Sequence, residues 1–400
     1  MSNWEERRFE DIVDVNPTTK LKKGKEYAFI DIDKVSPILR TVTNIETKIY
    51  DGQSCSKFIK GDTLFSRITP CLENRKIAQV DIIENAGFGS TEFYVFRARE
   101  NKADEKFVYY LGSSDVIVLP AINSMTGASG RQRADKRFIE RLKITVPDLS
   151  TQKRIASILS AYDDLIENNN KRIKILEQMA ENLYKEWFVR FRFPGYETAE
   201  FENGIPKGWE REKISKYYNT SSGGTPSRSN EQFYINGKHP WIKTGEVKDT
   251  IIIDTEEHIT DEAIKRSAAK LIPTKSVIMA MYGVNIGMLG YVDSEMTCNQ
   301  ACCVFSDKRD FSTKHYLYQY LKSIREYLLL ISFGAAQQNV SQELIKNIKI
   351  VMPTDNIVIK YERKIDVIYN SIKSLMYKNK NLIKQRDLLL PRLMSGKLEV

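Results

Sequence analysis

The sequence has no apolar run near the length that a membrane-spanning helix needs. Such a helix takes about 20 consecutive apolar residues, whereas the 42% of apolar residues here are interrupted throughout by the 28% that are charged. The opening residues MSNWEERRFE contain no apolar signal-peptide core either. We therefore expect a soluble cytoplasmic protein without a membrane partner. Its 400 residues are enough for two domains with sizeable cores.

Cysteine and histidine are scarce. The five cysteines are odd in number and lie in apolar or strand-like stretches, which fits a reducing compartment. The spacing of Cys298, Cys302 and Cys303 could hold a metal, but no second pair and no histidine lies at ligand spacing. The three histidines form no recognisable constellation with serine, cysteine or carboxylate. We therefore predict no metal site.

Motifs of catalysis are also missing. The sequence has no G-x-x-x-x-G-K-[ST] phosphate loop, no G-x-G-x-x-G fingerprint after a strand, and no H-E-x-x-H. Asn16-Pro17 is followed by two threonines, so the Asn-Pro-Pro-aromatic element of amino-methyltransferases is absent. We predict a non-catalytic chain without a cofactor of its own. The net charge of +9 indicates a polyanionic partner without proving one, because long cationic surface helices alone can produce it.

The sequence does contain two long amphipathic stretches, one from Ser150 to Phe188 and one at the C-terminus. Their apolar residues recur at steps of three and four, with a mean of about 3.6, so each stretch predicts a helix, the first about 55 to 60 Å long. We expect Pro391 to kink or stop the second helix. The predicted seam residues of the first helix are Ile155, Ile158, Tyr162, Leu165, Asn169, Ile173 and Leu176. Those of the second helix are Ile365, Ile368, Ile372, Leu375, Asn379 and Ile383, which match all of the first set except Leu176.

The two seams align residue by residue, including their asparagines, Asn169 and Asn379. One interpretation is simply two helices that pack on each other. The other adds a function: an antiparallel coiled coil that holds two modules at a fixed separation. Polar seam residues of this kind set the register of a coiled coil at some cost in stability.

The repeat extends to the rest of the chain. Trp4 matches Trp209, YAFIDIDKV matches HPWIKTGEV, and RLKITVP before the first helix matches NIKIVMP before the second. Short β-branched strands and helical patterns near 104–119 and 312–330 indicate mixed α/β modules. We predict an α+β protein of two tandem modules with pseudo-two-fold symmetry, and these segments: module 1–149, helix 150–193, linker 194–208, module 209–354 and helix 355–400.

Loops with basic, amide and hydroxyl side chains follow the strands of both modules. Arginine pairs with guanine, asparagine and glutamine pair with adenine, and lysine, serine and threonine hold phosphates. Loops rich in glycine, serine and asparagine can also be plain turns. The loop that ends in Arg131-Gln132-Arg133 recurs at an equivalent place as Gln337-Gln338-Asn339. This recurrence favours binding.

Several of these motifs resemble one known family, the specificity (S) subunits of type I restriction-modification enzymes. They are GGTPSRSNEQFY, PWIKTGEV, AAKLIP and IMAMYG in the second module, QKRIASILSAYDDLIENNN and NLYKEWFVRF in the first helix, and LLLPRLMSGKL at the C-terminus. LFSRITPCLENRKIAQ, GFGSTEFYVFRA and GASGRQRADKRFIERLKITVP in the first module are of the same type. The resemblance covers nearly the whole chain.

The resemblance implies a fold and partners. Each module would be a target-recognition domain that reads one half of a bipartite double-stranded DNA site, and the helices would be spacers. The implied partners are two methylation subunits that bind S-adenosylmethionine and methylate adenine, and two restriction subunits that use ATP and Mg to translocate and cleave DNA. Because the modules differ, the two half-sites should differ in sequence. The length of the helices places the half-sites about one turn of DNA, roughly 35 Å, apart.

Loop position and donor chemistry identify the candidate DNA-binding residues, since no base contact is carried over from the family. In the first module they are Arg67, Thr69, Asn74, Arg75, Lys76, Ser90, Thr91, Arg131, Gln132 and Arg133. In the second they are Ser227, Arg228, Lys243, Tyr282, Asn285, Asn299, Gln300, Gln337, Gln338 and Asn339.

Two alternatives stay open at this stage. One is a specificity subunit that serves a methyltransferase without a restriction partner, which would have the same sequence features. The other, from a different class, is an assembly hub whose coiled coil gathers partners and whose modules bind protein. The hub predicts binding that does not depend on DNA.

Overall fold

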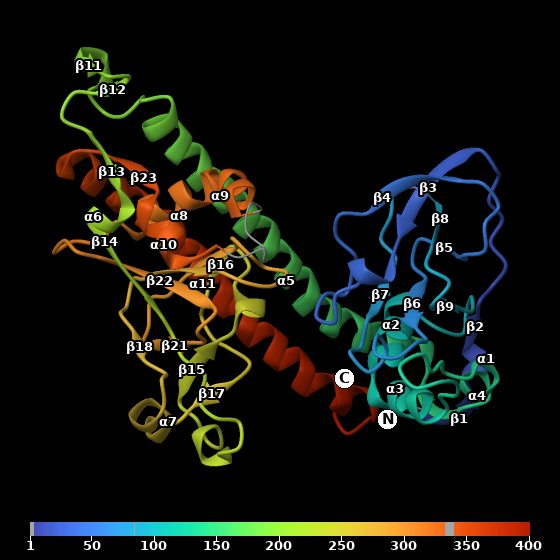
Figure 1. Ribbon diagram of the computed structural model, residues 1–400. Helices are drawn as coiled ribbons and strands as arrows, with labels where there is room; N and C mark the ends of the chain where they lie inside the picture. Colours follow the sequence, from blue (N-terminus) through green and yellow to red (C-terminus); the bar gives the residue numbers. More distant parts are fainter. Residues whose placement is uncertain (1–3, 84, 333–339) are drawn as a thin grey trace. The chain divides into compact units, whose positions relative to one another are not determined.

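The computed structural model describes residues 4–83, 85–332 and 340–400. Its two longest elements are the helices α5 (Leu149–Tyr184) and α11 (Asp355–Met394) (Figure 1). Within the described ranges, no helix combines the length and the apolar character that crossing a membrane requires.

The chain divides into two compact units, which are described separately. Residues 1–170 and 378–400 form the first unit, and residues 171–377 form the second. Each unit therefore holds one module together with a segment of α5 and a segment of α11.

In the first unit the module is built on two four-stranded sheets with the orders β2-β9-β6-β7 and β4-β3-β8-β5, and on the pair β1-β10. Within these sheets β3 pairs with β8 in parallel, and the other pairs are antiparallel. The elements are β1 (Trp4–Arg8), α1 (Phe9–Ile12), β2 (Val13–Val15), β3 (Lys25–Ile30), η1 (Ile32–Lys34), β4 (Glu46–Tyr50), β5 (Ser56–Ile59), β6 (Thr63–Ser66), β7 (Ile77–Gln79), β8 (Ala86–Gly89), β9 (Phe93–Ala98), α2 (Glu105–Ser113), α3 (Asp115–Asn123), α4 (Lys136–Glu140) and β10 (Lys143–Pro147).

In the second unit the sheets have the orders β14-β22-β19-β20-β16 and β17-β15-β21-β18, with the pairs β13-β23 and β11-β12. The elements are η2 (Lys185–Val189), η3 (Tyr196–Thr198), β11 (Phe201–Glu202), β12 (Ile205–Pro206), β13 (Glu210–Lys213), α6 (Ile214–Tyr217), β14 (Tyr218–Ser222), η4 (Glu231–Phe233), β15 (His239–Ile242), η5 (Thr244–Glu246), β16 (Thr250–Ile251), β17 (His258–Ile259), α7 (Asp261–Arg266), β18 (Leu271–Ile272), β19 (Val277–Ala280), β20 (Leu289–Tyr291), β21 (Met296–Cys298), β22 (Cys302–Asp307), α8 (Lys314–Ser323), α9 (Arg325–Ser332), α10 (Gln342–Asn347) and β23 (Lys349–Met352).

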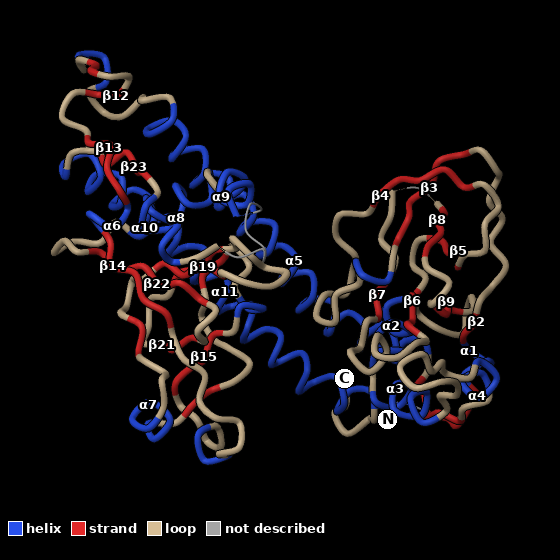
Figure 2. The backbone as a smooth tube through the Cα atoms, viewed as in Figure 1, coloured by secondary structure: helices blue, strands red, loops and turns tan. Residues whose placement is uncertain are grey.

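The two modules share one topology, which confirms the predicted duplication. The order β14-β22-β19-β20 repeats β2-β9-β6-β7, and β17-β15-β21-β18 repeats β4-β3-β8-β5. The parallel pair β15·β21 occupies the place of β3·β8. Both modules also mix strands with short helices, and the second adds η4, β16 and α7 to the shared elements (Figure 2). The mixed α/β architecture expected from the sequence is therefore correct.

The glycine-rich run before the candidates Ser90 and Thr91 is a strand. Gly87, Phe88 and Gly89 lie in β8, between β3 and β5. A Cβ atom on Gly89 would lie 2.1 Å from the Ile30 carbonyl oxygen, and one on Gly87 would lie 2.7 Å from that of Ala28. These glycines permit a close approach of backbones inside the sheet, and composition alone cannot distinguish this use from a turn.

The seam of α5 differs from its prediction between residues 155 and 169. Ile158 is 36% exposed and Leu165 is 46% exposed, whereas Leu159, Asp163 and Ile166 are buried. The hydrophobic pattern failed because a charged residue, Asp163, occupies a buried position. Of the other predicted seam residues, Ile155, Asn169, Ile365, Ile372, Leu375 and Asn379 are buried, and Tyr162, Ile173, Leu176, Ile368 and Ile383 are half-buried.

Pro391 does not stop the second helix, contrary to one form of its prediction. α11 continues through Pro391 to Met394. Proline has no backbone N–H, so α11 lacks the helical hydrogen bond from residue 391 to the carbonyl four residues earlier. In the first unit Leu393 and Met394 lie in the same buried cluster as Phe9 and Ile155.

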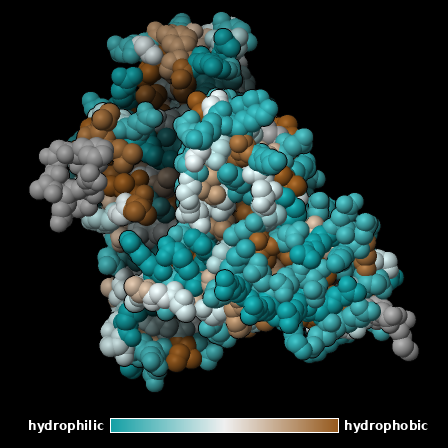
Figure 3. Space-filling view, turned by 90° about the vertical axis from the view of Figure 1, so that its right-hand side faces the viewer, coloured by the Kyte–Doolittle hydropathy of each residue, from teal (hydrophilic) through white to brown (hydrophobic). Residues whose placement is uncertain are grey.

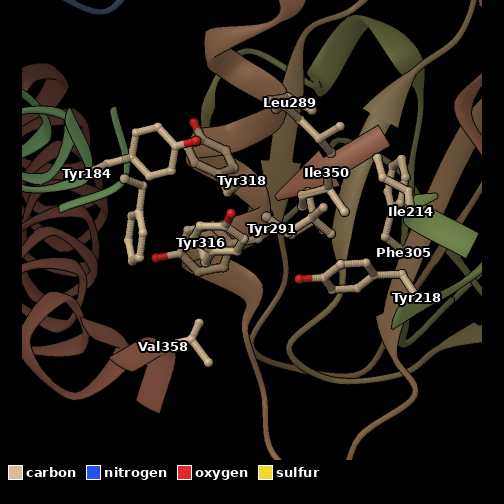
Figure 4. Close-up of a cluster of buried hydrophobic side chains, with 14 of the residues drawn as sticks. Tyr184, Ile214, Tyr218, Leu289, Tyr291, Phe305, Tyr316, Tyr318, Ile350 and Val358 are labelled. Carbon is tan, nitrogen blue, oxygen red and sulfur yellow. The ribbon is translucent and has the colours of Figure 1, made fainter. Parts of the chain in front are cut away.

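The core of the second unit joins its module to both long helices. Tyr184 of α5 and Val358 of α11 lie with Tyr316, Tyr291 and the other residues of one buried cluster (Figure 4). Two polar groups of this core have close partners: the Tyr218 hydroxyl lies 2.6 Å from Thr313 Oγ1, and Gln319 Nε2 donates to Tyr369 Oη at 2.9 Å. Among the described residues, the buried Tyr361 hydroxyl has no hydrogen-bond partner. Burial raises the pKa of Tyr316 and Tyr361, so both remain neutral.

Candidate nucleic-acid interface

The carboxyl ends of the two parallel strands meet at one edge of the first module. Ser90, which follows β8, donates its backbone N–H to the Ile30 carbonyl at the end of β3, at 3.1 Å. Arg67, which follows β6, donates its backbone N–H to the Glu92 carbonyl at 2.9 Å. Polar side chains that follow strands are thereby brought together by main-chain bonds.

The loop before α4 closes on the same place. Thr69 N donates to the Gln132 carbonyl at 3.0 Å, and Gln132 N donates to Thr69 Oγ1 at 3.1 Å. Ala134 N donates to the Arg67 carbonyl at 2.8 Å. Asp135 then caps α4, because its carboxylate accepts from Phe138 N at 2.7 Å. Residues 67–69, 90–92 and 131–134 together are called the first edge below.

A carboxylate that the sequence analysis missed organises the charges of the first edge. The Glu92 carboxylate accepts hydrogen bonds from Nε and Nη2 of Arg133, at 2.9 and 2.6 Å. It also accepts one from Nε of Arg67, at 3.3 Å. The hydrogen bond from Arg133 lowers the pKa of Glu92, so this side chain is charged at neutral pH. The Arg67 guanidinium also lies over the Tyr94 ring, 5.5 Å from its centroid.

The first edge unites most of the candidates predicted for this module. The main-chain and side-chain hydrogen bonds of the edge involve Arg67, Thr69, Ser90, Gln132 and Arg133. Thr91 and Arg131 are exposed in the same segments.

Two of the three candidates in the β6–β7 turn have side-chain partners outside the first edge. Arg75 pairs with Asp115 and donates to the Ser113 carbonyl at 3.0 Å, and Lys76 Nζ donates to the Ile32 carbonyl at 3.0 Å. Asn74 is exposed. Arg75 and Lys76 therefore have protein partners that hold neighbouring segments, which their basic character in the sequence did not reveal.

The second module repeats the backbone frame of the edge. Asn299 N donates to the Ile242 carbonyl at 2.9 Å, as Ser90 does to Ile30. Met281 N donates to the Ala301 carbonyl at 2.9 Å, and Val340 N donates to the Met281 carbonyl at 3.2 Å. These bonds make Met281, Ala301 and Val340 the equivalents of Arg67, Glu92 and Ala134. The second edge is defined as residues 242–243, 281, 299–301 and 340.

Basic side chains gather beside the second edge around a different carboxylate. Arg228 Nη1 lies 2.5 Å from Glu257 Oε2, and Lys243 Nζ lies 3.0 Å from Glu257 Oε1. The Arg228 guanidinium also lies 4.5 and 5.1 Å from the ring centroids of Tyr234 and Trp241. Glu257 thus pairs with two of the predicted residues, Arg228 and Lys243. It is not the equivalent of Glu92, because Ala301 occupies that position.

The remaining candidates of the second module that lie within the described residues fall into three groups. Asn285 Nδ2 donates to the Thr244 and Val247 carbonyls at 3.1 and 3.2 Å, so this amide stabilises the η5 turn. Gln300 accepts a hydrogen bond from the Thr225 hydroxyl, and the side chain of Asn299 accepts from Ala301 N. Tyr282 is 40% exposed, and the Ser227 hydroxyl bonds that of Ser229. Gln337, Gln338 and Asn339 lie outside the described residues.

The seam asparagines meet as the sequence predicts. In the first unit Asn169 Nδ2 donates to Asn379 Oδ1 at 2.8 Å, and Asn379 Nδ2 donates to Asn170 Oδ1 at 2.8 Å. Asn169 and Asn379 are both buried. These buried amide bonds join the two antiparallel helices. They therefore set the register, that is, which residue of α11 faces which residue of α5.

One face of the molecule is mainly polar. On the face that Figure 3 shows, hydrophilic residues predominate and hydrophobic residues form separate groups. Among the described residues, no group of three or more histidine, cysteine, aspartate or glutamate side chains is arranged to hold a metal ion. Cys298, Cys302 and Cys303 are buried thiols at the ends of β21 and β22.

Two modules of one topology, each with a loop-lined edge beside parallel strand ends, define a duplicated recognition protein. The model of the family called "Type I restriction modification DNA specificity domain" matches residues 1–178 and again residues 206–388. The chain therefore belongs to the family of type I restriction-modification specificity subunits, and the resemblance noted from its motifs is confirmed.

Individual relatives agree with this assignment. The specificity subunit of the type I restriction enzyme MjaIX of Methanocaldococcus jannaschii is 27% identical, over 100% of this chain and 94% of that protein. The HindI specificity subunit of Haemophilus influenzae is 26% identical, over 87% of this chain and 88% of that protein. The crystal structure of an S subunit from M. genitalium has a TM-score of 0.57 at 15% identity, covers 98% of this chain and 96% of its own, and shares the fold.

Proposed function

We propose that this chain is the DNA-recognition subunit of a type I restriction-modification complex. Each module reads one half of an asymmetric bipartite target in double-stranded DNA. The antiparallel helices set the gap between the half-sites and dock two methylation subunits, which bind S-adenosylmethionine and methylate adenine. Two restriction subunits with ATP and Mg complete the complex. The chain itself contributes recognition and no catalysis.

One observation supports this proposal above the others: the two edges have the same backbone bonds and different side chains. A duplicated frame with an antiparallel helix pair favours docking on duplex DNA in the manner of a symmetric dimer. Different side chains on that frame favour two different half-sites. We keep the segments inferred from the sequence, modules at 1–149 and 209–354, helices at 150–193 and 355–400 and a linker at 194–208, as part of the proposal.

The testing experiment is adenine-methylation mapping in cells that express this chain with its methylation subunit, before and after residues 1–149 are exchanged for another family module. We expect one half of the methylated sequence to change, while the other half and the gap stay the same. A change in both halves or in the gap would contradict the division of labour between modules and helices. A complex purified from its native cells that contains the methylation subunit and no restriction subunit would identify a methyltransferase-only system.

A salt titration separates this proposal from an assembly hub. The chain, co-expressed with its methylation subunit, is tested for binding to its mapped DNA site at increasing salt. Phosphate contacts by several lysines and arginines predict a steep linear fall of log affinity with log salt. A flat response without a preferred site would favour the hub.

Arg131→Ala is expected to relax reading at one position of the first half-site only. Arg131 is exposed in the first edge, and a lost bidentate base contact costs about 1 to 3 kcal/mol. The measurement is the methylated fraction at sites that differ from the native one by a single base pair. Arg141→Ala, an exposed arginine after α4, is the matched control. Unchanged methylation of native and variant sites by the Arg131 variant would remove this residue from the interface.

A further inference from the structure

The side chains of Arg67, Glu92 and Arg133 form a cluster that is only partly exposed to solvent. The exposed fraction is 20% for Glu92, 29% for Arg67 and 44% for Arg133. Arg133 is fixed at its backbone as well, because its N–H donates to the Thr126 carbonyl at 2.9 Å and its carbonyl accepts from Thr126 N at 3.1 Å. Both ends of this arginine are therefore held within the protein.

The way in which Glu92 holds Arg133 leaves one side of the guanidinium available. A guanidinium has five N–H donors in a planar fork. Glu92 occupies the side formed by Nε and Nη2. The remaining terminal nitrogen, Nη1, makes one long bond, of 3.4 Å, to the Arg131 carbonyl. The pair Nη1 and Nη2 can therefore still meet two acceptors, such as O6 and N7 of guanine.

The negative charge of Glu92 changes what the two arginines attract. An arginine without an acidic neighbour binds any phosphate of the DNA backbone. Here a phosphate that approaches Arg133 also approaches the Glu92 carboxylate, which repels it. A base edge carries no net charge, so the carboxylate repels its acceptor atoms much less than it repels a phosphate. The cluster thus disfavours sequence-independent contacts more than base contacts.

The second edge lacks this cluster. Its backbone equivalents of Arg67 and Glu92 are Met281 and Ala301, and both are uncharged. An effect that depends on Glu92 is therefore confined to the first module, which gives an experiment an internal reference within the same molecule.

We propose that Glu92 is a specificity-determining positioning residue of the first half-site: it orients Arg133 toward a G·C pair and opposes the binding of both arginines to phosphate. This inference rests on the proposed function and names one part of its mechanism. Glu92 itself need not touch the DNA.

The test uses the complex of this chain with its methylation subunit and the variant Glu92→Gln. The amide keeps the size of the side chain and removes its charge. We expect discrimination at one G·C pair of the first half-site to fall about tenfold, equivalent to about 1.4 kcal/mol, with the second half-site unchanged. We also expect tighter binding to unrelated DNA. The slope of log affinity against log salt concentration should become steeper by about the contribution of one phosphate contact. Glu92→Asp, which keeps the charge on a shorter side chain, should restore the weak binding to unrelated DNA.

Glu6→Gln is the matched control, because it breaks an exposed pair with Lys143, at 2.8 Å, on the β1-β10 sheet. It should leave both half-sites and the salt slope unchanged. Intact reading of the second half-site by Glu92→Gln shows that the variant chain folds. Wild-type discrimination and wild-type binding to unrelated DNA by Glu92→Gln would overturn the inference, as would an equal loss at both half-sites. If the wild-type complex methylates no bipartite sequence, the proposed function itself fails, and this outcome is seen before any variant is made.

Discussion

Arg386→Met is expected to destabilise the first unit by about 3 to 5 kcal/mol, the usual cost of breaking a buried ion pair. Arg386 of α11 donates to Asp163 of α5 at 2.6 Å, and their side chains are 11% and 4% exposed. The same guanidinium donates to the Ile38 carbonyl at 2.9 Å. Asp163 also accepts from the Tyr110 hydroxyl of α2, at 2.5 Å. Methionine would leave the buried carboxylate with too few donors.

Hydrogen exchange of the full-length chain measures this effect, because peptides report on each unit separately and two-domain chains rarely unfold in one step. Faster exchange is expected in α2 and in residues 155–169, with little change in the second unit. Lys143→Met, in the exposed pair with Glu6, should change stability by about 0.5 kcal/mol or less. The double variant Asp163→Asn with Arg386→Met should recover part of the loss, since it removes the stranded charge. Unaltered exchange in Arg386→Met would contradict the role of the pair.

Phe188→Ala is expected to destabilise the second unit by about 3 to 5 kcal/mol. This side chain is 8% exposed. Phe188 lies in the π-helical turn η2, which directly follows α5. Its ring lies 4.7 Å from the centroids of both Tyr316 and Tyr361, and 5.9 Å from that of Trp209. It therefore joins α5, α8, α11 and the start of the second module.

The control for this substitution is Phe201→Ala, a phenylalanine of the same unit that is 53% exposed. We expect it to cost about 1 kcal/mol or less. Exchange of peptides from α8 and from residues 355–372 should accelerate in the Phe188 variant and not in the control. Similar exchange in both variants would mean that the aromatic cluster adapts around the cavity.

The duplication could be predicted from sequence because it depends on regular patterns. Matching strands and matching helical seams produce the same order of elements twice, and Asn169 and Asn379 were paired correctly from their equivalent seam positions. The seam between residues 155 and 169 was misjudged because apolar residues stand side by side at 158–159 and 165–166. The decisive residue, Asp163, is charged, and only its partner Arg386 explains its burial.

The candidate site was predictable to the extent that it depends on strand ends. Polar residues after β6 and β8 were identified from their position, and the structure brings Arg67, Ser90 and Arg133 to one edge. Glu92 was missed because an acidic residue carries no signal of DNA binding by itself. Arg75 and Asn285 were included because their residue types suit base contacts, whereas their bonds to Asp115 and to the η5 turn are set by tertiary structure.

The backbone bonds of the two edges also bear on how such proteins change over time. The frame is built from main-chain groups, such as Ser90 N with Ile30 O and Asn299 N with Ile242 O, which any residue except proline can supply at the donor position. Substitutions at the half-buried donor positions, Ser90 and Asn299, therefore leave these main-chain bonds in place. Selection for a new DNA target can act on the side chains of an edge almost independently of selection for a stable module.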